Sequence, residues 1–160
     1  MALAAFVVGC IVLVRLQPVS APRPDVPAAG DCWFRAKGIK LFRGEQRCYR
    51  TLPRSRICGV WIPGFEQSLF LHDIDDLRGV GSVYYDELPW LDVASDATGL
   101  PPIRDGAPYH LCFLGRESNY YGAYGHFGVA HTGVLLEKVE TIEQIPVPKD
   151  FKFDLPGAAN

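Results

Sequence analysis

Short apolar runs separated by glycine and proline are the feature that most constrains this chain. The 160 residues include 16 Gly and 13 Pro, and these interrupt runs that are rich in β-branched and aromatic residues. Such spacing ends helices early and favours short strands joined by turns. A chain of this length is long enough to bury one core. The sequence therefore predicts a mainly β fold: a small antiparallel barrel of the OB type, or a sandwich, with long Gly/Pro loops.

The clearest strands are expected in the middle and toward the end of the chain. Residues 57–71 are apolar, β-branched and aromatic, with Pro63 and Gly64 as a turn or bulge between two strands. Residues 109–114 read as a buried strand. Residues 134–145 have apolar residues at helical spacing as well as β-branched residues, and we interpret them as a strand.

Other segments are less regular. Residues 32–51 are expected to form a short hairpin or an irregular cap. Residues 80–108 carry repeated Gly and Pro, so we expect mostly loop there, with a short strand at 83–85. We place a single β domain at 31–148, followed by a flexible tail at 149–160.

The N-terminus suggests export. Residues 2–14 form an apolar run, which is shorter than the roughly 20 residues that span a bilayer as a helix. We interpret residues 1–21 as a cleaved signal peptide; a retained inner-membrane anchor at 2–14, or a lipobox ending at Cys10, is the alternative. Residues 22–30, rich in Pro and Ala, are expected to be an extended tether. The predicted location is periplasmic or secreted.

The cysteine count agrees with export. Without Cys10, the domain keeps four cysteines, and an even number in an exported domain indicates one or two disulfides. We favour a bridge from Cys32 to Cys48 or Cys58, while Cys58 or Cys112 could instead be a buried thiol. No C-x-x-C spacing suggests a zinc ribbon or a redox pair.

Several short motifs carry a resemblance. They are Gly59-Val60-Trp61 with Gly64 to Ser68, Leu114-Gly115-Arg116, and Tyr124 to Gly128 followed by 134–145. This pattern resembles small exported bacterial proteins of uncharacterised function, which have a compact β domain and a YGHxG-type loop. The resemblance implies export and a β fold, and it implies no activity.

A loop rich in tyrosine and glycine, residues 118–133, is the main candidate for binding. Large, rigid and amphipathic rings make efficient contact residues. The candidate contact residues are Tyr120, Tyr121, Tyr124 and Phe127, with Trp61 beside them. In the alternative interpretation, two of these rings close the end of the barrel.

The same loop contains two histidines. His126 and His131 could turn toward one zinc or copper ion, with a third ligand from Glu117, His110 or the acidic segment 72–76. Their spacing matches no established zinc pattern, and we expect no cofactor. The acidic segment itself departs from the EF-hand pattern and is expected to be an exposed turn.

Opposite charges occupy adjacent blocks of the sequence. Residues 31–60 hold eight Lys/Arg and two acids, and residues 61–100 hold eight acids and one Arg, although the net charge is only −2. The blocks could neutralise each other, or the basic block could face an acidic partner. Near-neutral charge argues against nucleic acid, and the membrane is expected to be contacted only through the N-terminal segment.

No catalytic motif assembles from these residues. The chain has no G-x-S-x-G, phosphate-binding glycine loop or H-E-x-x-H. The sequence therefore predicts a non-catalytic binding domain of the bacterial cell envelope that recognises a protein partner, of an immunity or accessory type. A small metal-dependent hydrolase using His126 and His131 is the alternative.

Overall fold

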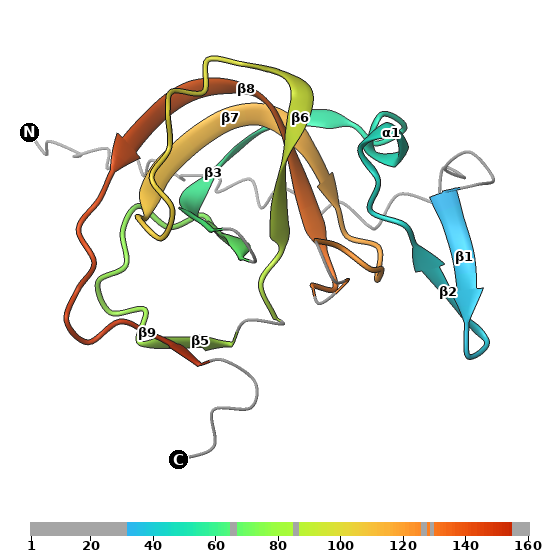
Figure 1. Ribbon diagram of the computed structural model, residues 1–160, viewed down its shortest axis with the longest axis horizontal. Coiled ribbons are helices and arrows are strands. Elements are labelled where there is room, and N and C mark those ends of the chain that lie inside the picture. The colour runs from blue at the N-terminus through green and yellow to red at the C-terminus, as the bar shows by residue number, and fades with distance from the viewer. Residues whose placement is uncertain (1–31, 65–66, 85–86, 126–127, 129, 155–160) are drawn as a thin grey trace, which may run out of the picture.

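The computed structural model describes residues 32–64, 67–84, 87–125, 128 and 130–154 (Figure 1). The predicted signal peptide or anchor and the tether lie outside these residues. Within the described ranges no helix is long and apolar enough to cross a membrane.

The protein is mainly β, as the sequence predicts. In chain order its elements are β1 (Trp33–Ala36), β2 (Ile39–Phe42), α1 (Gln46–Tyr49), β3 (Arg54–Pro63), β4 (Ser68–His72), β5 (Ser82–Tyr84), β6 (Trp90–Thr98), β7 (Tyr109–Ser118), β8 (Gly133–Gln144) and β9 (Lys152–Asp154). The segment interpreted as a strand at 134–145 is β8. A strand, β6, also occupies part of the segment expected to be mostly loop.

Five strands form one mixed sheet. Its order is β3-β4-β6-β8-β7, and β7 pairs again with β3, so the pairing closes on itself. The closure is narrow, because β4 and β6 share one registered pair, Leu69 with Trp90. The expectation of a purely antiparallel arrangement is wrong for this sheet, since β6 and β8 run parallel. These strands are not consecutive in the chain, so no hairpin turn dictates their direction.

Alternate residues of the sheet strands point to opposite sides. In β8, Val134 and Leu136 belong to the interior cluster, whereas Leu135 packs on the outside. The interior cluster combines aliphatic and aromatic side chains from β3, β4, β6, β7 and β8: Ile57, Trp61, Phe70, Leu91, Leu111, Phe113, Val134, Leu136 and Val139.

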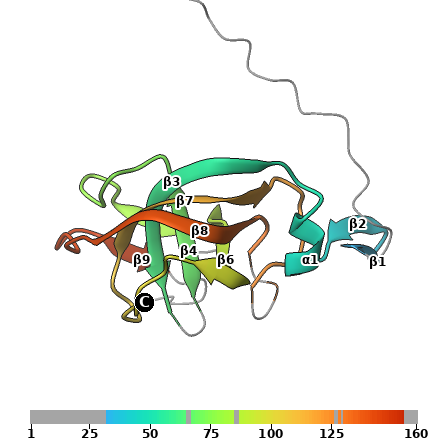
Figure 2. The same cartoon turned by 90° about the horizontal axis from the view of Figure 1, so that it is seen from above.

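Two groups of residues cover the outer side. The first, here called the N-terminal cover, is residues 32–52 and contains β1, β2 and α1. It packs Phe42, Cys48 and Tyr49 against Trp90 and Leu135, and it lies to one side of the sheet in both ribbon views (Figures 1 and 2).

The second group, here called the β5–β9 cover, packs aliphatic residues and Phe151 over the outer side of β3 and β4. Its members are Ile74, Leu77, Val80, Val83, Leu88, Ile145 and Phe151, which contact Val60, Ile62 and Leu71. Lys152–Asp154, within the segment expected to be a flexible tail, pairs in parallel with β5 as β9.

Both cysteine pairs are disulfides. Cys32 and Cys48 join the start of the N-terminal cover to α1, with a Cα–Cα distance of 5.5 Å. Cys58 and Cys112 face each other across β3 and β7 and are also bridged. The prediction of disulfides is confirmed, and two bridges are compatible with an oxidising compartment outside the cytoplasm.

Candidate functional site

A groove with a strongly basic lining lies between α1 and the outer side of the sheet. It has a volume of about 690 Å³ and is here called the arginine groove. Ala94 and Leu135 contribute buried apolar surface. The charged lining residues are the cations Arg47, Arg50, Arg54, Arg116 and Lys138 and the acids Asp96 and Glu137.

Three charged residues of the groove form a network. Arg54 and Arg116 are opposite each other in the register of β3 and β7. Both guanidinium groups reach Glu137 of β8, each with an N–O distance of 2.7 Å. Arg116 also donates to the backbone carbonyls of Arg50 and Leu52. This network fixes the chain after α1 against β7, and one carboxylate is shared by two guanidinium groups.

Gln46 fixes the other side of α1 to β6. Its side-chain NH₂ donates to the carbonyl of Val93 (2.9 Å), and its side-chain oxygen accepts from the N–H of Ser95 (3.1 Å). β6 leaves the β8 register just here, because it takes five residue steps from Val93 to Thr98 while β8 takes two. The Gln46 amide thus supplies hydrogen bonds to a stretch of β6 that lies outside the β8 ladder.

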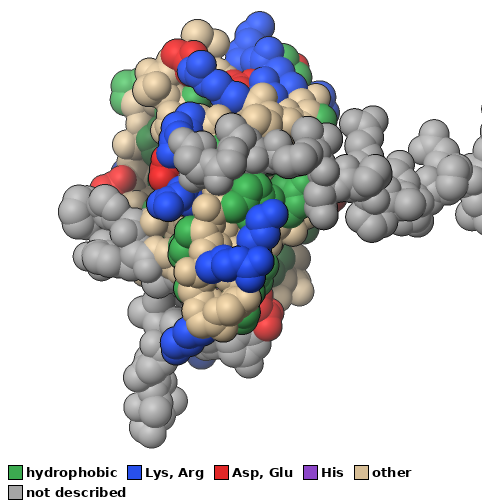
Figure 3. Space-filling view, turned by 90° about the vertical axis from the view of Figure 1, so that its right-hand side faces the viewer, with side chains coloured by type: hydrophobic (Ala, Val, Ile, Leu, Met, Phe, Trp, Pro, Cys, Tyr) green, Lys and Arg blue, Asp and Glu red, His purple; other side chains and the backbone are tan. Residues whose placement is uncertain are grey.

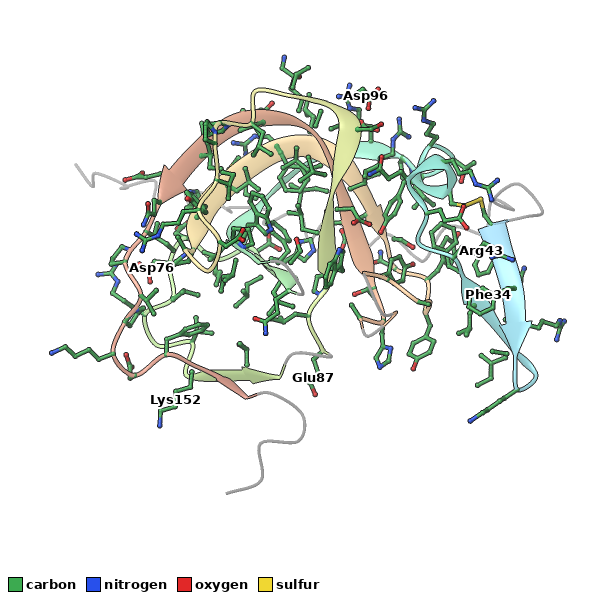
Figure 4. The ribbon with its side chains drawn as sticks, in the orientation of Figure 1. Phe34, Arg43, Asp76, Glu87, Asp96 and Lys152 are labelled. Atoms are coloured by element: carbon green, nitrogen blue, oxygen red, sulfur yellow. A yellow bond between two sulfur atoms is a disulfide. The ribbon has the colours of Figure 1, made fainter. Side chains whose placement is uncertain are left out.

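The groove concentrates positive charge on a protein that is acidic overall. Among the described residues, Arg50 and Lys138 form no ion pair. The side of the molecule that carries the N-terminal cover displays far more Lys and Arg than Asp and Glu (Figure 3), and Asp96 lies at the end of β6 beside α1 (Figure 4). A concave surface lined by one sign of charge attracts ligands of the opposite sign.

Two arginines of the basic block form ion pairs with acids that lie outside the acidic block. Arg54 pairs with Glu137 and Arg56 pairs with Glu140, both on β8 and outside the acidic block 61–100. Within the acidic block, Asp76 is held by Arg78, which keeps the pKa of that carboxyl below its usual range. These pairs leave much of the basic block facing solvent.

Most of the predicted aromatic contact residues are packed inside the protein. Trp61 lies in the interior cluster, and Tyr124 is buried against Phe42 and Tyr49. Tyr120 is partly buried beside Trp33, whereas Tyr121 is 55% exposed. Phe127 lies outside the described residues.

The buried Tyr124 has a structural role in this loop. Its hydroxyl lies 2.5 Å from Ser118 Oγ and donates to the carbonyl of Tyr120. Burial raises the pKa of Tyr124, so the hydroxyl remains protonated and can act as a donor. The ring is 1% exposed and packs with the N-terminal cover on the outer side of the sheet.

The histidines occupy separate places. His131 stacks on Tyr121, with ring centroids 4.5 Å apart, and His126 lies outside the described residues. His72 Nε2 lies 3.3 Å from Glu117 Oε1. His110 Nε2 lies 3.4 Å from Asp75 Oδ1. Within the part of the chain that the structure describes, no group of three or more His, Cys, Asp or Glu could hold a metal ion.

Sequence reasoning identified the basic block but missed the groove. Arg116, Glu137 and Lys138 come from β7 and β8, and the pairing of β3 with β7 and of β7 with β8 brings them to the chain that follows α1. Comparison with protein families, with curated proteins and with solved structures finds no match to the chain.

Proposed function

We propose that this protein is a non-catalytic binding domain that recognises an acidic segment of a partner protein in the arginine groove. The observation that carries the proposal is the charge of the lining, where five cations surround two carboxylates on a chain of net charge −2. Arginine side chains suit this role because the planar guanidinium binds carboxylates through two parallel hydrogen bonds.

The composition of the lining favours a peptide over a nucleic acid. Single-stranded nucleic acids are held by aromatic rings on which the bases stack, together with a basic track. The described lining of the arginine groove contains no aromatic residue; it offers Ala94 and Leu135 for apolar contact and the hydroxyls of Ser95 and Thr98. A volume of about 690 Å³ is within the usual range for ligand sites.

The setting that we propose is the bacterial cell envelope, with an OB-like barrel as the scaffold. The closed five-strand order supports the OB-like assignment, since that fold is a small, partly open five-stranded barrel. Two disulfides and the apolar run at residues 2–14 support export. An accessory or immunity-type protein that binds its partner non-covalently fits this scaffold.

The test reverses the two unpaired cations. The double variant Arg50→Glu with Lys138→Glu is titrated by calorimetry with a short synthetic peptide that alternates glutamate and serine. A second double variant, Arg104→Glu with Lys152→Glu, makes the same change in net charge at exposed positions that do not line the groove. We expect the groove variant to lose at least about tenfold in affinity, because each charge-assisted bond contributes roughly 1.5–3 kcal/mol.

The control decides how the result is interpreted. If the Arg104/Lys152 variant loses as much affinity as the groove variant, binding depends on net charge alone and the proposal is wrong. The proposal is also wrong if the peptide does not bind the unmodified protein at low salt.

A further inference from the structure

A second, smaller pocket lies on the same side of the sheet. It has a volume of about 440 Å³ and lies between the turn that precedes α1, the start of β6 and the loop between β7 and β8. Its lining residues are Arg43, Gly44, Glu45, Trp90, Asp92, Ala123 and Gly125. Among the described residues it shares no lining residue with the arginine groove, so it is a separate candidate site, here called the Asp92 pocket.

The central group of this pocket is a carboxylate with unused hydrogen-bonding capacity. Asp92 is half-buried, and Trp90 Nε1 donates to its Oδ1 at 3.1 Å. An ionised carboxylate has about four acceptor positions, and among the described residues this is the only hydrogen bond to the Asp92 side chain. The second oxygen is therefore available to a donor from a ligand.

The environment of Asp92 disfavours its charge. Burial raises the pKa of Asp92, and this effect is larger than the opposing effect of the Trp90 hydrogen bond. Nearby, the Tyr49 hydroxyl is fully buried and has no hydrogen-bond partner among the described residues. Burial raises the pKa of Tyr49, and the Tyr124 and Asp92 charges raise it further. Polar groups left unsatisfied in this way are a frequent mark of a binding site.

Two glycines line the pocket with backbone atoms only. Gly44 and Gly125 have positive φ angles of 68° and 74°. A Cβ atom would come within 2.7 Å of the Tyr124 ring at Gly44 and within 2.4 Å of the Trp90 ring at Gly125. Both glycines therefore pack directly on aromatic rings.

The charges of the pocket are mixed. Arg43 Nη1 and Glu45 Oε1 lie 3.9 Å apart, and Arg43 also lies over the Phe34 ring (Figure 4). An anionic ligand would meet the carboxylates of Glu45 and Asp92, and a simple cation would meet the Arg43 guanidinium. The best complement is a neutral molecule that both donates and accepts hydrogen bonds, and hydroxyl groups do both.

We propose that the Asp92 pocket binds a neutral saccharide, whose hydroxyl groups donate to the Asp92 carboxylate and accept from the Arg43 guanidinium. The indole N–H of Trp90 holds the carboxylate in position. The pocket volume of about 440 Å³ is within the usual range for small-molecule sites. This site is independent of the peptide site proposed for the arginine groove.

The test uses tryptophan indole N–H signals in NMR spectra of the labelled protein. Glucose, N-acetylglucosamine, maltose and chitobiose are the probes, with choline as a cationic comparison. We expect at least one saccharide to shift the Trp90 indole signal, assigned with a Trp90→Phe variant, with saturation in the millimolar range or below. Choline is expected to leave this signal unchanged.

Two substitutions locate the binding. Asp92→Asn keeps the size of the side chain and removes its charge, and Ala123→Phe fills the pocket from the loop. Each is expected to weaken saccharide binding by about tenfold or more, since hydrogen bonds to charged groups are the stronger ones. The matched control is Asp105→Asn, the same change at an exposed position that lines neither pocket, which should leave the saccharide affinity unchanged.

A stability measurement separates binding from structural damage. Because the pKa of Asp92 is raised by folding, the folded state holds this proton more tightly than the unfolded state does. The free energy of unfolding therefore falls as pH rises from the ordinary carboxyl pKa through the raised value. Asp92→Asn removes that fall, so the variant should be at least as stable as the unmodified protein at neutral pH while it binds saccharide less well.

Three results would overturn the proposal. They are the absence of any saccharide-induced shift at Trp90, tighter binding of choline than of any saccharide, and an equal loss in the Asp92→Asn and Asp105→Asn variants. The acidic peptide is titrated into Asp92→Asn in parallel. Unchanged peptide affinity is expected, so failure at the Asp92 pocket and failure at the arginine groove can be told apart.

Discussion

The two covers close opposite parts of the same sheet with different chemistry. In the N-terminal cover, Phe42 packs edge-on or tilted against the rings of Trp33, Tyr49, Tyr120 and Tyr124. The cover is also tied by the Cys32–Cys48 disulfide and by the side chain of Gln46. The described side chains that pack in the β5–β9 cover are instead aliphatic, apart from the phenylalanine Phe151.

The difference in packing between the two covers shows how a small domain can hold charged residues at defined positions. Aliphatic packing is non-directional and requires mainly matched volume. Ring contacts, a disulfide and side-chain hydrogen bonds fix orientation as well. The N-terminal cover thus holds α1 in one position, and with it Arg47 and Arg50 at the edge of the arginine groove. The β5–β9 cover only needs to keep apolar surface from water.

The largest effect is expected from removing the central ring of the N-terminal cover. Phe42 is fully buried, and truncating a buried phenylalanine to alanine costs about 3–5 kcal/mol. Phe42→Ala should therefore lower the free energy of unfolding by this amount, measured by urea denaturation. At temperatures where the variant is still folded, its affinity for the acidic peptide should also fall, because α1 loses its support.

The matched change in the other cover is Leu77→Ala. Leu77 is 1% exposed, and a buried Leu→Ala change costs about 2–5 kcal/mol. This variant should lose stability and keep its peptide affinity. If Leu77→Ala and Phe42→Ala lower the affinity for the acidic peptide equally at matched stability, the two covers do not differ in the way that we infer.

Removing the disulfide of the N-terminal cover should have the next largest effect. The cysteines are separated by 16 residues, and closing a loop of about 15 residues contributes roughly 3 kcal/mol in the chain-entropy description. We expect the double variant Cys32→Ser with Cys48→Ser to lower the unfolding free energy by up to that amount. Its affinity for the acidic peptide should also fall. Cys58→Ser with Cys112→Ser tests the other bridge, which should affect stability without a specific effect on the groove. The reverse pattern would contradict the comparison.

The sequence predicts those strands whose residues favour extended structure by themselves. β3, β4, β7 and β8 are rich in β-branched and aromatic residues, and their positions follow from that pattern. The sequence does not predict β6, because Trp90–Thr98 includes two Asp and two Ala, residues that are depleted in strands. It is a strand because Leu91 faces the interior and the backbone pairs in parallel with β8. Such pairing between distant segments leaves no local signal.

The candidate sites were predictable only in part. The basic block at 35–56 is visible in the sequence and supplies Arg47, Arg50 and Arg54 to the groove. Its carboxylate partners on β8 and the role of Gln46 depend on tertiary packing. Tyrosines in a glycine-rich loop indicate binding in sequence, yet the structure packs Tyr124 fully and Tyr120 partly against the N-terminal cover.

A smaller effect is expected from Gln46, which connects α1 to β6. Replacing Gln46 by alanine removes two hydrogen bonds, each with a net contribution of about 0.5–1.5 kcal/mol. We expect the unfolding free energy to fall by about 1–3 kcal/mol, and the peptide affinity to fall by more than this loss of stability alone would cause. Hydrogen exchange of the Ser95 amide should speed up in the variant. Protection of that amide equal to the unmodified protein would show that Gln46 does not fix α1 to β6.

The smallest effects are expected from the ion pairs. An exposed pair and a more buried pair should differ in coupling energy. The pair between Arg56 and Glu140 is more exposed, with side-chain accessibilities of 59% and 32%, than the pair between Arg116 and Glu137, with 21% and 19%. Exposed pairs contribute about 0–1 kcal/mol because water and salt screen them. Double-mutant cycles with glutamine replacements should therefore give a small coupling energy for the first pair and a larger one for the second. Added salt should remove most of the first coupling and less of the second. If the two coupling energies are equal, the pair between Arg116 and Glu137 stabilises the attachment of the N-terminal cover no more than an exposed surface ion pair would.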